Sequence, residues 1–347
     1  MSHQTNMEKS KIGVLLVNLG TPDDPSRGAV YRYLKQFLLD PRVIDINAIS
    51  RNLLVRGIIA PFRSGKSAAL YKKLWTDEGS PLKFNGYKLT EGVRSILGNE
   101  YHVELAMRYQ SPSIEASLDK LRKAQVNRII VFPLFPHYAS ASTGSVHEAV
   151  MKEISKWQII PEIHLINSFP TRPEMIKIFA DEGRKMNYKE YDHIIFSYHG
   201  LPQRQMRKGD ITNSHCQRKV DCCKELTTIN QFCYSAQCYA TTKALVEELG
   251  LKENQYTTCF QSRLGRDPWI QPYTSDILKV RADAGDKKLL VFCPAFVSDC
   301  LETIIEVSEE YYEEFHEMGG EKVDLVSSLN NKPEWIETVA TMIKELS

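Results

Sequence analysis

Short apolar runs alternate with longer amphipathic stretches along most of this chain. The runs are four to seven residues long and apolar over most of their length, which is typical of strands covered on both faces in a parallel sheet. The stretches between them carry apolar residues at helical spacing. This alternation predicts an α/β fold with eight strands, at Ile12–Asn18, His102–Met107, Arg128–Leu134, Ile163–Ile166, His193–Ser197, Tyr256–Phe260, Leu289–Cys293 and Lys322–Val326.

The predicted strands fall into two sets of four, with the break near Pro170–Pro173. Because parallel strands are joined by crossover helices, each set predicts one doubly wound, Rossmann-like domain with a four-stranded parallel sheet. We expect an N-terminal domain over residues 10–172 and a C-terminal domain over residues 173–331. Residues 332–347 should form a last helix that packs back on the first domain, since proline is favoured at the first helical position and Pro333 stands there.

Composition narrows the class of protein. A chain of 347 residues with 42% hydrophobic and 25% charged residues is an ordinary globular protein of two-domain size. The net charge of +1 creates no overall field, so we expect no nucleic-acid partner, and any membrane contact must be local. The segment Met1–Ser10 is polar and does not resemble a signal peptide, and no apolar run is long enough to span a bilayer. We therefore expect a cytoplasmic protein.

In parallel sheets, ligands bind at the carboxyl ends of the strands. In this sequence those ends carry aromatic residues, hydroxyls, arginines and two histidines, His137 and His199. They predict a cleft between the domains that suits a flat, partly apolar, anionic ligand. His199 follows a buried strand and precedes a turn, so it is either a surface residue or a general base or metal ligand.

A row of acidic residues follows the seventh predicted strand. Glu302, Glu306, Glu309 and Glu313 recur at helical spacing and should share one face of a helix, where like charges repel one another. The row is either a solvated helix face or an acidic track that attracts a divalent cation or carries protons away.

The segment of residues 44–63 is apolar but interrupted by charge. Ile46, Ile49 and Leu53 could form one apolar face, with Arg51, Arg56 and Arg63 beside it. Such a segment is either a helix packed on the core or an interfacial lip that contacts lipid or guides an apolar substrate.

Five of the eight cysteines lie within one polar segment, between Cys216 and Cys238. In the cytoplasm such clusters are more often metal ligands or redox groups than disulfides, and free structural thiols are the simpler alternative. Zinc sites usually use closely spaced cysteine pairs, of which there is one here, whereas four thiolates on an irregular loop also suit a [2Fe–2S] cluster. Because adjacent side chains diverge, the predicted ligands are Cys216, Cys223, Cys233 and Cys238, with Cys222 as the alternate.

Several short motifs occur together over nearly the whole chain. They are Val17-Asn18-Leu19-Gly20-Thr21-Pro22, Gly79-Ser80-Pro81, Met107-Arg108-Tyr109, Ser197-Tyr198-His199-Gly200-Leu201-Pro202, Gln261-Ser262-Arg263 and Ser298-Asp299-Cys300-Leu301-Glu302-Thr303. Each motif is weak alone, but the combination resembles the ferrochelatases, which have two Rossmann-like domains. The resemblance implies a lyase that forms metal–nitrogen bonds by inserting Fe²⁺ into a porphyrin.

The resemblance also implies a substrate and a set of site residues. The substrate would be protoporphyrin IX and the product protohaem, in the last step of haem biosynthesis. Coproporphyrin or another tetrapyrrole as the substrate, and a non-catalytic haem or Fe–S carrier, are the alternatives. His199 and Glu302 would form the catalytic pair at the site of the Fe²⁺ substrate, and Glu306 would continue the acidic track. The implied porphyrin-binding residues are Arg63, Tyr71, Ser80, Arg108, Tyr109 and Trp269.

Two further expectations follow from the resemblance. The cysteine-rich residues 211–238 are additional to the common bacterial pattern and are similar to an internal insertion that carries a [2Fe–2S] cluster in a minority of bacterial ferrochelatases. Residues 44–63 correspond to the family's apolar lip at the active site, through which peripheral contact with the inner membrane is expected. The oligomeric state is left open.

Overall fold

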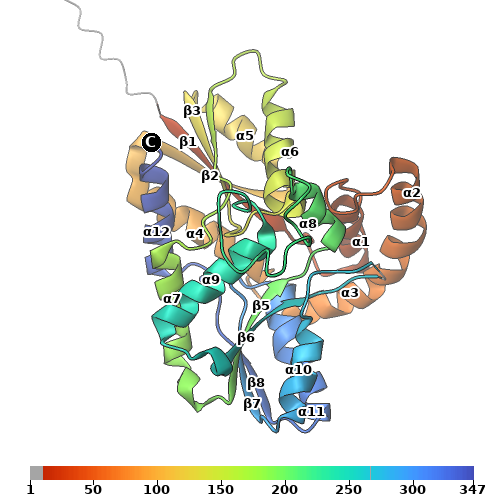
Figure 1. Ribbon diagram of the computed structural model, residues 1–347. Coiled ribbons are helices and arrows are strands. Elements are labelled where there is room, and N and C mark those ends of the chain that lie inside the picture. The colour runs from red at the N-terminus through yellow and green to blue at the C-terminus, as the bar shows by residue number, and fades with distance from the viewer. Residues whose placement is uncertain (1–10, 266) are drawn as a thin grey trace, which may run out of the picture.

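The computed structural model describes residues 11–265 and 267–347. The polar segment Met1–Ser10, and with it the first residue of the predicted N-terminal domain, lies outside the described residues. Within the described ranges the chain builds two separate β-sheets, one from each half of the sequence (Figure 1).

All eight predicted strands are present and form two four-stranded parallel sheets, which confirms the predicted α/β fold. The first sheet has the order β2-β1-β3-β4, with β1 at Ile12–Gly20, β2 at Tyr101–Tyr109, β3 at Arg128–Pro133 and β4 at Glu162–Leu165. The second has the order β6-β5-β7-β8, with β5 at His193–His199, β6 at Tyr256–Gln261, β7 at Lys288–Phe292 and β8 at Lys322–Leu325.

Helices cover both faces of the first sheet because successive strand residues point to opposite sides. Val14 and Leu16 of β1 face α4 (Pro81–Leu97), whereas Leu15 and Val17 face α5 (Ile114–Lys123) and α6 (Ser145–Ile154). Both faces are therefore buried, as the unbroken apolar runs predict.

The second sheet is covered in the same way. The helices α7 (Pro173–Lys185) and α9 (Tyr234–Leu249) lie on one face, and α10 (Thr274–Asp283), α11 (Tyr312–Glu317) and the π-helix η6 (Leu301–Tyr311) lie on the other (Figure 1). The face toward α7 and α9 shares one continuous core with the α4 face of the first sheet. The two sheets are thus joined by packed apolar side chains.

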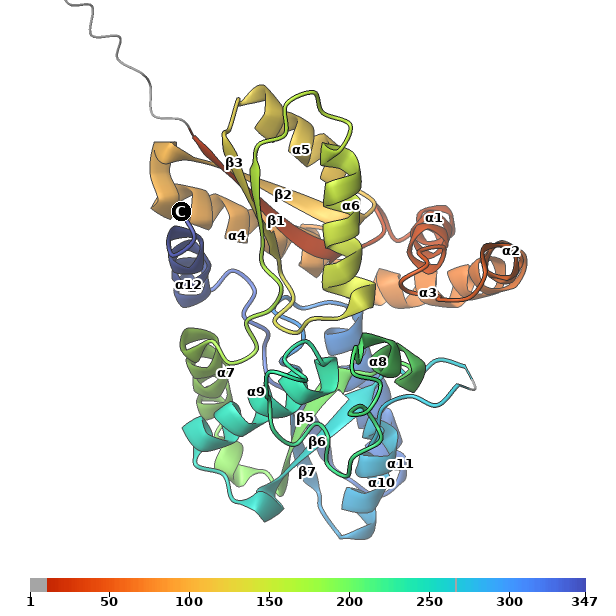
Figure 2. The same ribbon diagram turned by 45° about the horizontal axis from the view of Figure 1, so that its top comes forward.

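The last helix, α12 (Pro333–Lys344), lies against α4 of the first sheet (Figure 2). Its Trp335 is fully buried in the shared core. A Cβ atom added to Gly92 of α4 would lie 2.6 Å from Cδ1 of Ile336, so glycine allows the two helices to approach closely.

The segment of residues 44–63, called the lip below, forms a protrusion at one side of the molecule (Figure 2). It contains α2 (Ala48–Leu53), the π-helix η1 (Leu54–Ile59) and the start of α3 (Ala60–Leu74), which packs against α1 (Arg27–Leu38). Ile49, Leu53 and Phe62 are 75%, 70% and 79% exposed, so the lip carries an uncovered apolar face.

Shorter elements complete the fold. The helix α8 follows β5 at Gln203–Gly209, and the cysteine-rich residues after it consist of turns until α9 begins at Tyr234. Short 3₁₀ and π turns lie at Gly98–Glu100, Ser140–Gly144, Tyr188–Glu190 and Glu253–Gln255. No helix in the described ranges combines the length and the apolar character needed to cross a bilayer.

Candidate active site

The carboxyl ends of both sheets face one cleft of about 1120 Å³, part of it open to solvent. Part of its wall comes from the residues that follow β1, β3, β5 and β7, as expected for parallel sheets, and the rest includes side chains of α1, α3 and the start of α4. Most of the lining side chains are apolar or aromatic. The polar and ionisable residues in the wall are Asn18, Thr21, Tyr33, Tyr71, Ser80, His137, Ser142, His199, Tyr234, Ser298, Cys300 and Glu302.

His199 is the last residue of β5 and lies half-buried in the cleft wall. Its Nδ1 lies 2.7 Å from the carbonyl oxygen of Gly200. Because a carbonyl oxygen only accepts hydrogen bonds, Nδ1 carries a proton, and in the neutral tautomer that makes this bond the lone pair lies on Nε2. The Trp269 ring lies 6.3 Å from the His199 ring, and the Tyr234 hydroxyl donates to the His199 carbonyl oxygen at 2.8 Å.

Gly200 is required by the packing behind the histidine. A Cβ atom at this position would lie 2.8 Å from the carbonyl oxygen of Gln261 and 3.1 Å from the Trp269 ring. Only glycine lets β5, β6 and the indole meet this closely.

Glu302 lies in the first turn of η6 and lines the same cleft, so both members of the predicted pair, His199 and Glu302, line one cleft. Beside it are two buried phenols. Burial, and after it the charge of Glu302, raises the pKa of Tyr33 well above its usual value. Burial, then Tyr33 and Glu302, does the same for the pKa of Tyr71. Both hydroxyls therefore stay protonated next to the carboxylate.

Glu306 lies one turn further along η6 and outside the cleft wall. Four groups donate to its carboxylate: the Ser262 backbone N–H at 2.9 Å, the Ser262 hydroxyl at 2.6 Å, the Tyr311 hydroxyl at 2.9 Å and Gln261 Nε2 at 3.1 Å. Gln261 Nε2 also donates to the carbonyl oxygen of Glu302 at 2.7 Å, so the end of β6 holds the start of η6 in place.

The predicted α-helical row of acidic residues is wrong for residues 301–311, which form a π-helix. A π-helix has a wider turn with i→i+5 bonds, so a spacing of seven residues no longer returns to the same face. Glu309 pairs with Lys73 of α3. Glu310, rather than Glu309, lies close to Glu306. Burial, and then the charge of Glu306, raises the pKa of Glu310.

The predicted porphyrin-binding residues divide into two groups. Tyr71 and Ser80 line the cleft, and the Ser80 hydroxyl lies 2.9 Å from the Thr21 hydroxyl. The others lie outside the described wall of this cleft: Arg63 is exposed on α3, Trp269 packs behind His199, and Arg108 and Tyr109 end β2.

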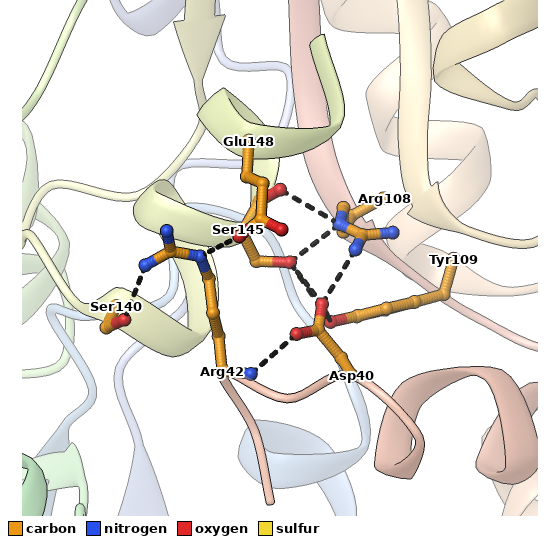
Figure 3. Close-up of polar contacts among 7 residues, drawn as sticks. All are labelled: Asp40, Arg42, Arg108, Tyr109, Ser140, Ser145 and Glu148. Carbon is orange, nitrogen blue, oxygen red and sulfur yellow. Dashed lines mark hydrogen bonds and ion pairs between the residues drawn. The ribbon is translucent and has the colours of Figure 1, made fainter. Parts of the chain in front are cut away.

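Arg108 and Tyr109 belong to a polar network centred on the buried carboxylate of Asp40 (Figure 3). Asp40 Oδ2 accepts from Arg108 Nη2 at 2.7 Å, from the Tyr109 hydroxyl at 2.9 Å and from the Ser145 hydroxyl at 2.5 Å. Asp40 Oδ1 accepts from the Arg42 backbone N–H at 2.7 Å. The network joins the end of β2, the start of α6 and the residues leading to the lip. The sequence contained no signal for Asp40.

A second histidine, His137, lines the cleft after β3. Its Nε2 lies 2.8 Å from the Thr241 hydroxyl, which itself donates to Pro170 O, so Nε2 carries the proton. Burial lowers the pKa of His137 to about 3, and the ring stays neutral. Its position after a strand end was the only signal for it in the sequence.

The helix α8 links the strand that carries His199 to the base of the lip. Arg204 Nη2 and Lys208 Nζ lie 2.6 Å and 2.5 Å from the carboxylate oxygens of Asp45. Burial opposes ionisation of Asp45, but Lys208 and Arg204 outweigh it and lower the pKa of this carboxyl. Gln205 Nε2 donates to the Val43 carbonyl oxygen at 3.2 Å.

Four cysteines of the insertion gather where α9 begins. The Sγ atoms of Cys222 and Cys223 lie 3.6 Å apart. The Cys223 thiol lowers the pKa of Cys233 to about 6, and the backbone amides of the first turn of α9 add to this effect despite burial. Burial, then Cys233 and Cys222, raises the pKa of Cys216 to about 11.

Cys238 lies deeper than these four. It is fully buried on α9 within the core shared by the two sheets, and burial raises its pKa well above the usual value. The structure therefore groups Cys222, rather than Cys238, with Cys216, Cys223 and Cys233.

The cysteine group has the donor atoms of a [2Fe–2S] site. In the described part of the chain, no three His, Cys, Asp or Glu side chains are grouped tightly enough to hold a single metal ion. A binuclear cluster instead distributes four thiolates over two irons. Two thiolates on one tetrahedral metal, with bonds of about 2.3 Å, lie about 3.7 Å apart, and Cys222 and Cys223 are 3.6 Å apart. The donor set and this spacing fit the cluster.

Comparisons with known proteins agree on one family. The family model described as "Ferrochelatase" matches residues 11–347. The chain is 43% identical over 337 residues to the ferrochelatase of Coxiella burnetii strain Dugway 5J108-111, covering 97% of this chain and 94% of the relative. It is 43% identical over 333 residues to the ferrochelatase of Legionella pneumophila strain Lens, covering 96% and 98%.

A solved structure shares the fold at much lower sequence identity. The sirohydrochlorin chelatase SirB of Bacillus subtilis subspecies spizizenii, in complex with cobalt, superposes with a TM-score of 0.51 at 13% identity, over 96% of this chain and 94% of SirB. With two parallel four-stranded sheets, a cleft that holds His199 and Glu302, and relatives that match nearly end to end, this chain belongs to the ferrochelatase family.

Proposed function

We propose that this protein inserts Fe²⁺ into protoporphyrin IX to form protohaem, the last step of haem biosynthesis. The observation that carries the proposal is the cleft, whose largely apolar lining includes both His199 and Glu302. Imidazole and carboxylate ligands bind Fe²⁺ without the strong retention expected of thiolates. Membership in the ferrochelatase family and the names of the relatives support the same reaction.

Iron insertion releases two N–H protons from the porphyrin while the four ring nitrogens replace water on Fe²⁺. We assign both protons in turn to Nε2 of His199, because Nδ1 is engaged with the Gly200 carbonyl oxygen; the imidazole passes the first proton to water in the open cleft before it accepts the second. Glu302 then guides the incoming Fe²⁺ as a negatively charged oxygen ligand. Glu306, fixed by four donors, acts as a stationary negative charge beside this path.

The porphyrin-binding residues take different roles in this proposal. Tyr71 and Ser80 contact the macrocycle from the cleft wall. Arg63 on the exposed lip pairs with a propionate, and Trp269 supports the His199 ring from behind. Arg108 and Tyr109 act through Asp40, by holding the base of the lip, rather than by touching the porphyrin.

An anaerobic assay with Fe²⁺ and each of protoporphyrin IX, coproporphyrin and sirohydrochlorin tests the proposal. Loss of the free-porphyrin absorption should be fastest with protoporphyrin IX. Faster turnover of another tetrapyrrole would make that tetrapyrrole the substrate in place of protoporphyrin IX. Tight binding of haem without any metallation would identify a carrier instead of an enzyme.

We also propose that Cys216, Cys222, Cys223 and Cys233 hold a [2Fe–2S] cluster. The support is the grouping of these four thiols and the 3.6 Å spacing of Cys222 and Cys223. When bound, such a cluster supplies a one-electron redox centre. The chain's own contribution is a low pKa at Cys233, which favours the thiolate that a metal requires.

Two serine variants test this ligand set. Cys222→Ser should lose the visible absorption of the cluster and its EPR signal after one-electron reduction, because one of four ligands is missing. Cys238→Ser, the matched control in the core, should keep both signals. If Cys238→Ser loses the cluster and Cys222→Ser keeps it, the proposed ligand set is incorrect, and a colourless protein that contains zinc would exclude the cluster itself.

The exposed apolar face of the lip supports a third proposal, peripheral binding at the surface of the inner membrane by an otherwise cytoplasmic protein. Ile49, Leu53 and Phe62 project from the protein without a covering element, and Arg56 and Arg63 lie among them. Apolar side chains flanked by cationic ones favour an anionic lipid interface.

Sedimentation with vesicles of phosphatidylethanolamine and phosphatidylglycerol tests the membrane contact. Phe62→Ser should reduce the bound fraction by about tenfold or more, since burial of one large apolar side chain contributes roughly 1.5–3 kcal/mol. Ile159→Ser, which removes an equally exposed apolar side chain before β4, is the control. Equal loss in both variants, or no binding by the unmodified protein, would argue against the lip as the contact.

A further inference from the structure

Tyr234 lies between the cysteine site and the catalytic cleft. It is the first residue of α9, directly after Cys233, and is only 6% exposed. Its ring lines the cleft, 5.9 Å from the His137 ring in an edge-to-face arrangement. Its hydroxyl donates to the carbonyl oxygen of His199 at 2.8 Å. One side chain therefore contacts the backbone of the catalytic histidine and adjoins a proposed cluster ligand.

Asn230 connects Cys222 by hydrogen bonds to Cys233, the residue before Tyr234. Asn230 Nδ2 donates to the Cys222 carbonyl oxygen at 3.0 Å and to the Glu225 carbonyl oxygen at 2.8 Å. The Asn230 carbonyl oxygen accepts from the Cys233 backbone N–H at 2.8 Å. A continuous set of hydrogen bonds thus runs from Cys222 through Asn230 to Cys233, and Tyr234 continues it to His199.

The start of α9 is fixed on its other side by the first sheet. Gln237 Oε1 accepts from the Tyr138 backbone N–H at 2.7 Å, and Gln237 Nε2 donates to the Gln231 carbonyl oxygen at 2.5 Å. The first turn of α9 is therefore held at several points, and a shift of Cys233 must move Tyr234 or break one of these bonds.

We infer that Tyr234 is a positioning residue through which the cysteine site sets the placement of His199. The inference rests on the proposed [2Fe–2S] cluster and assigns that site a partner inside the protein. With all four thiolates bound, Cys233 is fixed, and Tyr234 holds the end of β5 so that Nε2 of His199 stays directed into the cleft. With a ligand lost, the turns before α9 loosen, and the hydrogen bond to the His199 carbonyl oxygen is made less often.

Hydrogen–deuterium exchange at the end of β5 measures this coupling directly. The Gly200 backbone N–H donates to the Gln261 carbonyl oxygen at 2.8 Å, so its exchange reports whether the strand end is held. Tyr234→Phe removes only the hydroxyl and should speed exchange of the 198–202 peptide by about threefold to tenfold, the range expected for one buried hydrogen bond. Tyr239→Phe, the same change on the same helix but outside the cleft wall, should leave it unchanged.

A double-mutant comparison separates coupling from a purely local effect. Cys222→Ser should speed exchange of the same peptide by a similar factor in the otherwise unmodified protein, but by less than about twofold when Tyr234→Phe is already present. Equal effects of Cys222→Ser in both backgrounds, or no effect in the unmodified one, would overturn the inference.

The kinetic signature is specific as well. Tyr234→Phe should lower kcat by about threefold to tenfold while KM for porphyrin stays the same, because the bond orients the base rather than binding the substrate. A rise in KM alone would assign Tyr234 to substrate binding and contradict the inference. Failure of the unmodified protein to metallate any porphyrin would remove the proposed function but leave the exchange result standing on its own.

Discussion

Replacement of His199 by alanine should lower the rate of iron insertion by at least about a hundredfold, the lower end of what a general base contributes. At the end of β5 the proton acceptor is Nε2 of His199, because Nδ1 is engaged with the Gly200 carbonyl oxygen. Alanine removes the proton acceptor but leaves the strand and its backbone bonds in place. The measurement is the anaerobic loss of porphyrin absorption with Fe²⁺, at saturating porphyrin.

A control variant and two further measurements on His199→Ala accompany this prediction. His102→Ala, a change at an exposed histidine of β2 that pairs with Glu104, should leave the rate unchanged. The cluster absorption and the melting temperature of His199→Ala should match the unmodified protein, since the side chain is only half-buried. A variant that keeps more than a tenth of the original rate would show that another group accepts the porphyrin protons, and His137 would then be the first residue to examine.

Replacement of Asp40 by alanine should lower the free energy of unfolding by about 3–5 kcal/mol, the usual cost of breaking a buried ion pair. The carboxylate accepts from Arg108, Tyr109 and Ser145 and from one backbone amide, and alanine satisfies none of them. The guanidinium of Arg108 would be left mostly buried without a counter-charge. Denaturant unfolding followed by circular dichroism, with calorimetry as a check, measures the loss.

Two further variants calibrate the Asp40 result. Asp40→Asn keeps one acceptor oxygen but loses the charge, so its destabilisation should lie between those of the unmodified protein and Asp40→Ala. Asp119→Ala removes an exposed carboxylate that pairs with Arg122 and Lys123 on α5 and should change stability little. If Asp40→Ala destabilises no more than Asp119→Ala, the network in Figure 3 does not contribute to stability as its geometry indicates.

The strands were the most predictable part of the molecule, for a physical reason. Strands covered on both faces must be apolar at nearly every position, and this leaves an unbroken signal in the sequence that needs no knowledge of the partner strand. His199 was predicted in the same way, because the carboxyl end of a parallel strand is where such sheets bind ligands, and it lies in the cleft wall. Both inferences depend on short stretches of chain.

The features that sequence reasoning missed depend on contacts between distant segments. The spacing of Glu302, Glu306 and Glu309 is compatible with an α-helix. The segment is a π-helix in which Ser262 and Tyr311 hold Glu306, and Ser262 lies far from this segment in the sequence. Nothing in the sequence distinguishes Asp40 from the other acidic residues, because its partners Arg108 and Ser145 lie far from it along the chain. The choice between Cys222 and Cys238 as a cluster ligand stays a prediction, because their spacing does not distinguish them and the burial of Cys238 arises from packing against the core.

Ion pairs within the lip and beyond it restrict how the cleft can open. Within the lip, Asp45 is paired with Arg204 and Lys208 of α8, and beyond it, near the end of α3, Lys73 is paired with Glu309 of η6. These contacts attach the lip and α3 to the second sheet, because α8 follows β5 and η6 covers one face of that sheet. The lip is therefore held by ion pairs on both sides rather than attached through a single hinge. Any opening of the cleft on this side is therefore expected to involve α2 and η1, which lie between these two contacts.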